Sequence, residues 1–256
     1  TCSPRAGSAC SGVARWTLVL GLAAAAASAL ALSWFDVLPG GYTLRGWVEP
    51  HPAREAREWR EYREDRLAHF REQDDVAMGA VAFLGSSTIE RMPLEAFAAP
   101  CVGLGIGMEP IAQLRDRLTV GLPSDLAGIV LYLASIDFRR DRSSPARTRA
   151  IATEIFDRLQ AERPGIPVVV IGILPEVGMA DDLIQLLADT NAALADLCQS
   201  RGAAFVRTDR GPLRAANRSL AEEFTDDGLH LNQAGYQVLV RWLIEDGGAT
   251  GAILGG

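Results

Sequence analysis

The chain contains 256 residues, of which 48% are hydrophobic and 22% are charged, a composition that suits one globular domain with additional segments. Its formal net charge of −7 argues against a nucleic-acid-binding surface, so no nucleic-acid partner is expected. The cysteines Cys2, Cys10, Cys101 and Cys198 form no CxxC pair and no cysteine–histidine cluster with zinc-ligand spacing, so no metal site is expected. A disulfide between Cys101 and Cys198 is left open, because a domain of this size needs no cross-link.

The N-terminal part of the chain is predicted to enter a membrane. No residue between 16 and 35 is charged, and a helix of about twenty such residues is long enough to span a bilayer. Arg5 and Arg15 precede this stretch and Asp36 follows it, which places residues 1–15 in the cytoplasm and the rest of the chain outside. The sequence therefore predicts a transmembrane anchor with the main domain in the periplasm or the extracellular space.

A cleaved signal peptide is the alternative interpretation of residues 16–35. Two small-residue motifs, at 27–29 and 29–31, resemble cleavage sites, and the alanine-rich stretch is only weakly hydrophobic. A buried core helix is the third interpretation. Cleavage would release a secreted protein, so the anchor and the signal peptide both export the domain that follows.

Residues 36–75 are expected to connect this segment to the main domain. The stretch 36–50 is rich in glycine and proline and is typical of a linker. From residue 52 to residue 75 the chain is dense in arginine and glutamate, with large apolar side chains interspersed. This pattern predicts an amphipathic helix that packs on the domain. The main domain is accordingly assigned to residues 76–256.

The main domain alternates between apolar runs and helical patterns. The runs suited to buried strands are residues 79–84, 100–104, 128–133, 167–172 and 203–206. The helical patterns cover residues 88–97, 109–119, 146–162, 181–200 and 232–245. Strand–helix alternation with apolar strands predicts an α/β fold with a five-stranded parallel sheet that helices cover on both faces. In such a sheet, functional residues lie at the carboxyl ends of the strands.

The first of these strand ends carries a serine suited to nucleophilic chemistry. The string FLGSSTIE closes the first predicted strand at Gly85, and a helix begins just after it. A serine at this place has its hydroxyl at the edge of the sheet and its backbone N–H at a helix start, where the N–H can stabilise an oxyanion. On this string alone, helix capping by Ser86, Ser87 or Thr88 is the simpler alternative.

A histidine near the end of the chain supplies the second element. The string DGLHLNQAGY places Asp227 three residues before His230 and ahead of the last predicted helix. An aspartate at this spacing can hold one ring nitrogen while the other nitrogen accepts a proton from a serine. The other two histidines, His51 and His69, fall beside the linker and in the charged helix, where solvated or packing roles are expected.

Together the two strings resemble the SGNH hydrolase family, also called GDSL-like lipases or acylhydrolases. The resemblance covers residues 79–245 and implies a flavodoxin-like three-layer α/β fold. It implies that Ser87 is the nucleophile and that Asp227 and His230 complete a catalytic triad. It also implies a serine esterase that works through an acyl-enzyme and needs no metal ion or organic cofactor.

The family's second block, which resembles N-x-G-x-G-G, is altered here. Its final glycine donates an oxyanion N–H in the family, and in strict register Met108 replaces that glycine, with Gly107 one residue away. Any residue except proline carries a backbone N–H. The resemblance therefore implies an oxyanion hole built from the N–H groups of Ser87 and of either Met108 or Gly107.

The third block, which resembles G-x-N-D, departs further. Here it reads Ala134-Ser135-Ile136-Asp137, so Ile136 stands where the family has an asparagine that donates a side-chain N–H. Asp137 keeps its place, and a structural hydrogen-bonding role is expected for it. Ser135 is a candidate substitute donor, and Ser86 is a weaker one. Loss of one oxyanion donor lowers kcat by about 10²–10³-fold. Isoleucine in place of asparagine at residue 136 therefore favours a slow enzyme over an inactive one.

Two functions are compatible with these residues. The leading hypothesis is an envelope-exposed ester hydrolase that acts on an O-acyl glycan, a lysophospholipid or a short-chain ester, or transfers the acyl group to a sugar hydroxyl. The alternative is a degenerate SGNH domain that binds a glycan or a partner without catalysis. The changes at Met108 and Ile136 favour the alternative, and the retained serine, aspartate and histidine oppose it. The sequence determines neither the acyl group nor the oligomeric state.

Overall fold

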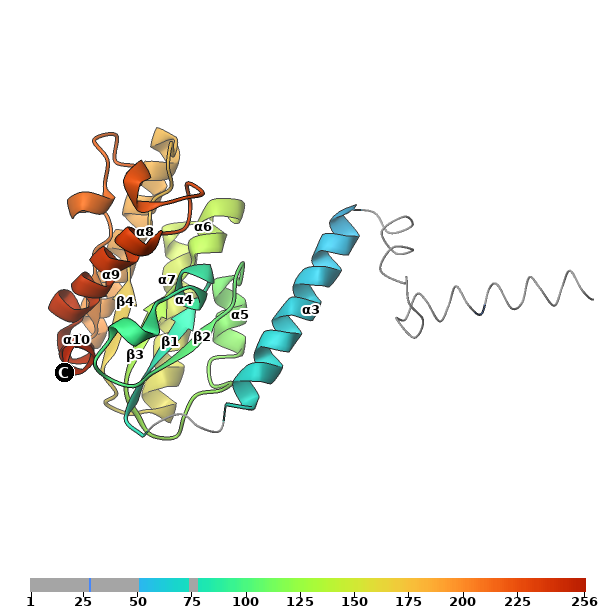
Figure 1. The fold of residues 1–256 in the computed structure, drawn as a ribbon, viewed down its shortest axis with the longest axis vertical. Helices are drawn as coiled ribbons and strands as arrows, with labels where there is room; N and C mark the ends of the chain where they lie inside the picture. Colours follow the sequence, from blue (N-terminus) through green and yellow to red (C-terminus); the bar gives the residue numbers. More distant parts are fainter. Residues whose placement is uncertain (1–27, 29–50, 74–77) are drawn as a thin grey trace, which may run out of the picture. The chain divides into compact units, whose positions relative to one another are not determined.

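The computed structural model describes Ser28, residues 51–73 and residues 78–256 (Figure 1). The predicted anchor or signal at 16–35 and the predicted linker at 36–50 therefore lie outside the described residues, apart from Ser28. Among the helices of the described part, none combines the length and the apolar character needed to cross a membrane.

The chain divides into two units, Thr1–Glu64 and Asp65–Gly256, and the structure describes the second apart from residues 74–77. Helix α3 (His51–Arg71) crosses this division, so its C-terminal end belongs to the second unit. Phe70, for example, is buried, and a Cβ added at Gly121 would lie 2.7 Å from the Phe70 Cβ. The second unit therefore begins within α3, ahead of the expected domain boundary at residue 76.

The second unit is built on a five-stranded sheet in which every neighbouring pair of strands is parallel. The register aligns Gly85 with both Gly105 and Tyr132, so three strand ends meet at one edge. The spatial order is β2-β1-β3-β4-β5, which is the flavodoxin-like order and confirms the predicted parallel sheet. The strands are β1 (Ala80–Gly85), β2 (Cys101–Gly105), β3 (Leu126–Tyr132), β4 (Val168–Ile171) and β5 (Ala204–Val206).

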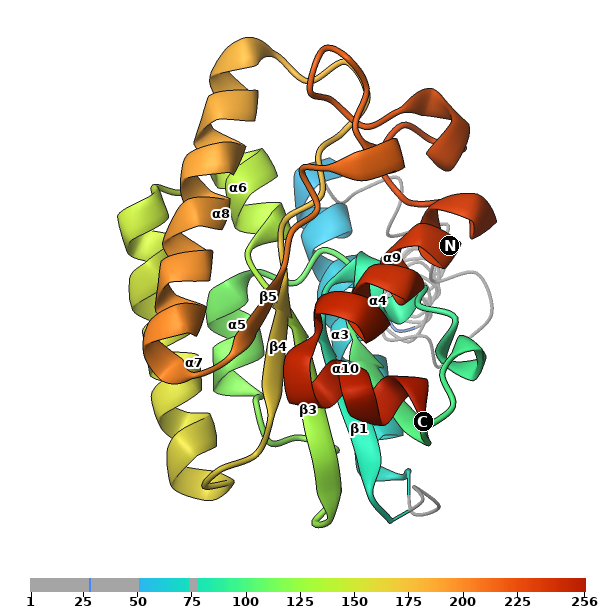
Figure 2. The same ribbon diagram turned by 90° about the vertical axis from the view of Figure 1, so that its left-hand side faces the viewer.

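Helices cover both faces of this sheet (Figure 2). Successive side chains of a strand point to opposite faces, and Val81 and Phe83 of β1 pack in the same cluster as Leu239 and Leu243. All of β1 is buried, as expected for a strand that is covered on both sides. One face carries α5 (Ile111–Asp116), α7 (Pro145–Glu162) and α8 (Asp181–Arg201), and the other carries α9 (Gln233–Asp246) and α10 (Gly248–Gly255).

Three stretches differ from the expectation. The helix expected at 88–97 is two short pieces, α4 (Ser87–Glu90) and the 3-10 turn Leu94–Ala96. Pro93 separates them, because it lacks an N–H and disfavours a helical conformation in the residue before it. Neither α6 (Ser135–Asp141) nor α10 is among the helices expected from the sequence. Helix α10 is rich in glycine, which has a poor helix propensity, and its packing against β3 and β4 stabilises it instead.

Cys101 and Cys198 are free thiols, so the disulfide left open by the sequence does not form. Burial raises the pKa of the Cys101 thiol to about 11 and the pKa of the Cys198 thiol to about 12. Both thiols are therefore protonated at neutral pH, and they contribute to packing rather than to thiolate chemistry.

Candidate active site

Ser87 is the first residue of α4 and follows directly on the end of β1. The chain turns sharply between the two elements, and a Cβ added at Gly85 would lie 2.7 Å from both Ile89 Cγ1 and the carbonyl oxygen of Tyr132. Only glycine fits this close approach. The turn leaves Ser87 at the carboxyl edge of the sheet, with its backbone N–H in the first turn of a helix, where that group has no intrahelical acceptor.

His230 connects Ser87 to Asp227 through two hydrogen bonds. Its Nε2 lies 3.0 Å from Ser87 Oγ, and its Nδ1 lies 2.6 Å from Asp227 Oδ2. The carboxylate holds the ring so that Nδ1 donates, which leaves Nε2 as the acceptor for the Ser87 hydroxyl. The structure thus brings together the three residues that the sequence singles out, although Ser87 and His230 are 143 positions apart.

The loop before α9 holds Asp227 in place. The backbone N–H groups of Leu229 and His230 both donate to Asp227 Oδ1, at 2.9 and 2.7 Å. Arg91 Nη1 lies 3.8 Å from the other carboxylate oxygen, Oδ2. The side-chain hydrogen bond with His230, assisted by these backbone hydrogen bonds, holds the pKa of Asp227 well below its usual range. The carboxylate is therefore ionised at neutral pH.

A hydrogen bond joins helix α9, which follows His230, to helix α4, which carries Ser87. Tyr236 Oη donates to the carbonyl oxygen of Thr88 at 2.9 Å. Asn232 caps α9 by accepting a hydrogen bond from the Gly235 N–H at 3.0 Å. The last residues of the DGLHLNQAGY string thus orient the helix that follows the histidine.

The loop after β2 carries the altered second block. Met108 is 53% exposed and has a φ of +60°, the left-handed conformation that glycine adopts without strain. The Gly107 N–H donates to Glu90 Oε2 at 2.9 Å, whereas the Met108 N–H has no acceptor among the residues that the structure describes. Of the two N–H groups that the sequence leaves open, the Met108 N–H is therefore the one available to a substrate, and the Gly107 N–H is engaged.

The third block lies at the start of α6. Ile136 is 9% exposed and carries no side-chain donor. Asp137 Oδ2 accepts a hydrogen bond from the Ile111 N–H at 2.8 Å, and burial raises the pKa of Asp137. Ser135 Oγ lies 2.8 Å from Ser86 Oγ, so the two candidate substitute donors are hydrogen-bonded to each other. Only one proton is used in that bond, so one of the two hydroxyls keeps a proton for another acceptor.

Ala134 has a φ of +63° at the place where the family's third block has glycine. A left-handed conformation costs a residue with a Cβ about 1–2 kcal/mol. Replacing Ala134 with glycine is therefore expected to raise the free energy of unfolding by about 1 kcal/mol, after the extra entropy of glycine in the unfolded chain is subtracted. Urea denaturation of the two proteins measures the difference.

The matched control for this change is Ala152→Gly in the interior of α7, a buried helical position. There the same replacement is expected to lower the free energy of unfolding by about 1 kcal/mol. Equal losses of stability in both variants would show that the backbone of Ala134 is not strained.

Two residues near the triad, Glu90 and Arg91, are absent from the sequence-based candidates. They follow Ser87 by three and four positions, the spacing at which side chains share one face of a helix, and this spacing is the signal that identifies them. Asn191, in contrast, has a structural role, because its side chain bonds the N–H and the carbonyl oxygen of Ile173 at 2.8 and 3.0 Å.

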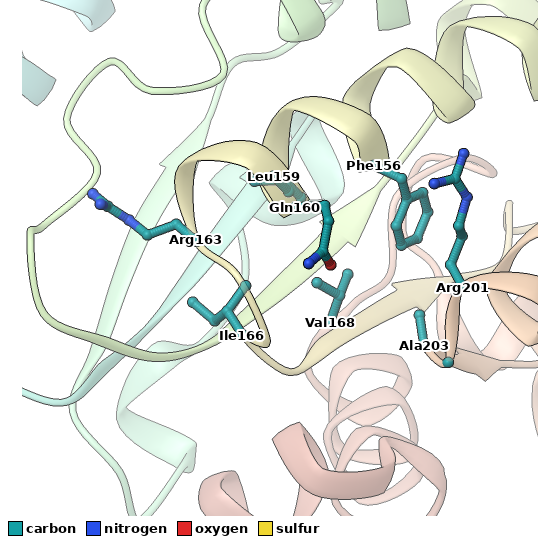
Figure 3. A pocket seen from close by; sticks show the side chains of 9 residues that line it. Phe156, Leu159, Gln160, Arg163, Ile166, Val168, Arg201 and Ala203 are labelled. Carbon is teal, nitrogen blue, oxygen red and sulfur yellow. The ribbon is translucent and has the colours of Figure 1, made fainter.

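The cavity shown in Figure 3 is separate from Ser87. It has a volume of ≈ 60 Å³ and lies at the amino end of β4, where Val168 begins the strand, beside Leu159 of α7 and Arg201 of α8. Ser87 lies at the opposite edge of the sheet. Within the described ranges, no group of three histidine, cysteine, aspartate or glutamate side chains is arranged to hold a metal ion.

Comparison with known proteins places this arrangement among related folds. A family model described as the GDSL-like lipase/acylhydrolase family matches residues 57–238. A Streptococcus pneumonia protein with the provisional description of platelet activating factor has a TM-score of 0.67 and 22% identity, over 73% of this chain and 94% of that chain. A search of the curated proteins finds no match.

Two further solved structures share the fold. A GDSL-like lipase from Bacteroides thetaiotaomicron VPI-5482 has a TM-score of 0.57 and 19% identity, over 71% of this chain and 92% of that chain. A catalytic mutant of an acetylxylan esterase from Geobacillus stearothermophilus has a TM-score of 0.52 and 12% identity, over 68% of this chain and 96% of that chain. At these identities the likeness concerns the fold alone.

Proposed function

Because the chain belongs to the GDSL-like lipase/acylhydrolase family, we propose that it is a serine ester hydrolase that works through an acyl-enzyme on Ser87. The observation that carries the proposal is the continuous chain of hydrogen bonds from Asp227 through His230 to Ser87, at 2.6 and 3.0 Å. At these distances an imidazole can take the serine proton while the hydroxyl oxygen attacks a carbonyl carbon.

Acylation begins when His230 Nε2 removes the Ser87 hydroxyl proton and Oγ bonds to the ester carbonyl carbon. The carbonyl oxygen becomes an oxyanion, which accepts hydrogen bonds from the backbone N–H groups of Ser87 and Met108. The bond from that carbon to the alcohol oxygen then breaks, and the alcohol leaves with the proton that His230 holds. Asp227 stays ionised and stabilises the imidazolium in the interval.

Deacylation follows the same route with water as the nucleophile. His230 takes one proton of the water while the water oxygen bonds to the acyl carbon. The carbon–oxygen bond to Ser87 then breaks, Oγ recovers the proton, and the carboxylic acid leaves. The scheme requires no metal ion and no organic cofactor. A sugar hydroxyl in place of water would make the same acyl-enzyme a transferase.

The proposed substrates are esters of the cell envelope: an O-acyl glycan, a lysophospholipid or a short-chain ester. One of the similar structures is that of an acetylxylan esterase, which supports an acetylated glycan within this class. Export of the domain, as proposed from residues 16–35, is compatible with such substrates.

The domain is proposed to lie outside the cytoplasm, with residues 16–35 as its anchor or as a cleaved signal. A reporter that is active only after export is expected to be active when it is fused after Asp36. The reason is that positive charges precede the apolar stretch, which directs the following residues out of the cytoplasm. Activity of a cytoplasm-only reporter would reverse this orientation. Recovery of a soluble form that begins near Leu30 or Leu32 would identify cleavage instead of anchoring.

A fluorophosphonate probe tests the proposed chemistry, because it labels a serine whose hydroxyl is activated. The full chain is expected to label at Ser87 and to hydrolyse p-nitrophenyl acetate, and the control variant His230→Ala is expected to do neither at a comparable rate. A folded wild-type protein that neither labels nor hydrolyses the ester would favour the non-catalytic glycan- or partner-binding module.

A further inference from the structure

Met108 occupies a tight turn that its side chain does not favour. The Glu109 N–H donates to the carbonyl oxygen of Ile106 at 3.3 Å, which closes a four-residue turn with Met108 in third place. A φ of +60° at that place is typical of a type II turn, which usually has glycine there. A type I turn suits methionine better, and the two types differ by a flip of the central peptide that reverses the Met108 N–H. Contacts from outside the turn therefore decide where this N–H points.

Glu90 supplies such a contact on the N-terminal side of Met108. Its Oε2 accepts the hydrogen bond from the Gly107 N–H at 2.9 Å. Glu90 follows Ser87 by one helical turn on α4, so its carboxylate ties the turn to the helix that carries the serine. The end of β2 lies close to α4, because a Cβ added at Gly105 would be 2.3 Å from the Glu90 backbone nitrogen. The two proposed oxyanion donors, on Ser87 and Met108, are thus linked through Glu90.

Arg66, near the C-terminal end of α3, forms an ion pair with the Glu90 carboxylate. Arg66 Nε lies 3.5 Å from Glu90 Oε1, and Arg66 Nη2 donates to the carbonyl oxygen of Gly105 at 2.9 Å. The guanidinium carbon lies 4.9 Å from the centre of the Phe70 ring, which restricts the side chain further. One arginine therefore contacts both the end of β2 and the residue that fixes the turn.

A buried ion pair holds the turn on the C-terminal side of Met108. Arg117 Nη2 lies 2.6 Å from Glu109 Oε2, and the two side chains are 2% and 1% exposed. The same nitrogen donates to the carbonyl oxygen of Leu104 at 2.8 Å. The Arg117 guanidinium also lies over the Phe70 ring, at 5.4 Å. Both neighbours of Met108 are thus fixed, and the Phe70 ring of α3 lies against both guanidinium groups.

We propose that Glu90 is a positioning residue that orients the Met108 N–H toward the oxyanion, and that Arg66 holds Glu90 in this role. The inference rests on the proposed ester hydrolysis. Neither side chain touches the substrate; both act through the turn. A displacement of about 1 Å at the reacting centre costs about 10²-fold in rate, so loss of Glu90 slows the chemical step and leaves substrate binding unchanged.

The test compares Glu90→Ala and Glu90→Gln in the full chain with p-nitrophenyl acetate. Glu90→Ala is expected to lower kcat by about 10–100-fold with KM within about twofold of the wild type, because the Met108 donor is misplaced. The affinity for methylboronic acid, which forms a tetrahedral adduct on the serine, is expected to fall by a similar factor. Glu90→Gln is expected to recover most of kcat, because its amide oxygen still accepts from the Gly107 N–H.

The matched control is Glu154→Ala, which removes an exposed ion pair between Glu154 and Arg115 and is expected to keep the wild-type kcat. If Glu90→Ala does not fold, Arg66→Ala is tested in its place. This variant is expected to lower kcat by about 3–10-fold at unchanged KM, which is a part of the loss expected when the donor is misplaced. The positioning role alone would be overturned by either of two results. One is a wild-type kcat in a folded Glu90→Ala or Arg66→Ala protein, and the other is an equal loss of kcat in Glu90→Ala and Glu90→Gln. An inactive wild type would overturn the proposed function as well.

Discussion

Replacing Ser87 with alanine is expected to lower kcat for ester hydrolysis by up to about 10⁶-fold, because without the serine oxygen no acyl-enzyme forms. The backbone N–H groups of residues 87 and 108 remain in this variant, so residual catalysis comes only from the oxyanion contacts and substrate binding. Rates with p-nitrophenyl acetate and labelling by the fluorophosphonate probe measure the loss.

Two further variants complete this experiment. Asp227→Asn is expected to lower kcat by about 10⁴-fold, because an amide cannot hold the His230 ring in the required tautomer. Ser200→Ala is the control, since the Ser200 hydroxyl donates to the carbonyl oxygen of Leu197 on α8 and takes no part in the site. Substantial hydrolysis or labelling in the Ser87→Ala protein would refute the assignment of Ser87 as nucleophile.

Replacing Ile136 with asparagine is expected to raise kcat by at most about 10²–10³-fold, which is the factor that one oxyanion donor contributes to kcat. The family resemblance places a side-chain donor at this position, and Ile136 supplies none. The gain is smaller if neighbours adapted to isoleucine do not orient the amide. Steady-state kinetics with p-nitrophenyl acetate test the change, and adding Ser87→Ala to the same chain is expected to remove all of the gain.

Ile136→Leu is the matched control, because leucine keeps an apolar side chain of similar volume at this nearly buried position and brings no donor. Urea denaturation checks the fold, because an unpaired amide in such a position costs about 1–3 kcal/mol. Equal rates in Ile136→Asn and Ile136→Leu, in folded proteins, would mean that the missing asparagine does not limit the site. The hydroxyl pair of Ser86 and Ser135 would then be the next candidate donor.

The fold class and the three residues of the proposed triad could be predicted from the sequence. The strands are continuous apolar runs, and a strand that is buried on both faces needs such a run whatever its neighbours are. Gly85 marks the end of β1 because the close approach of Ile89 and Tyr132 admits no side chain there. Parallel strands bring their carboxyl ends to one edge, so the position of Ser87 just after β1 predicts that it lies at that edge.

Short elements were harder to predict, because local propensity does not decide them. Helix α10 is glycine-rich and forms where it packs against β3 and β4. Pro93 could have indicated the break after α4, yet the periodic apolar pattern across 88–97 favoured one helix.

The sequence by itself determined the parallel α/β sheet, and it pointed to the serine, aspartate and histidine of the proposed triad, whose signals are local strings and strand ends. Only the tertiary structure decided that the Gly107 N–H is engaged and the Met108 N–H available, because the deciding contact comes from Glu90, on a different element. It also decided that Arg66 of α3 reaches this turn. Such contacts join residues that are 17 and 39 positions apart, and no periodicity or spacing in the chain encodes which distant side chains the fold will bring together.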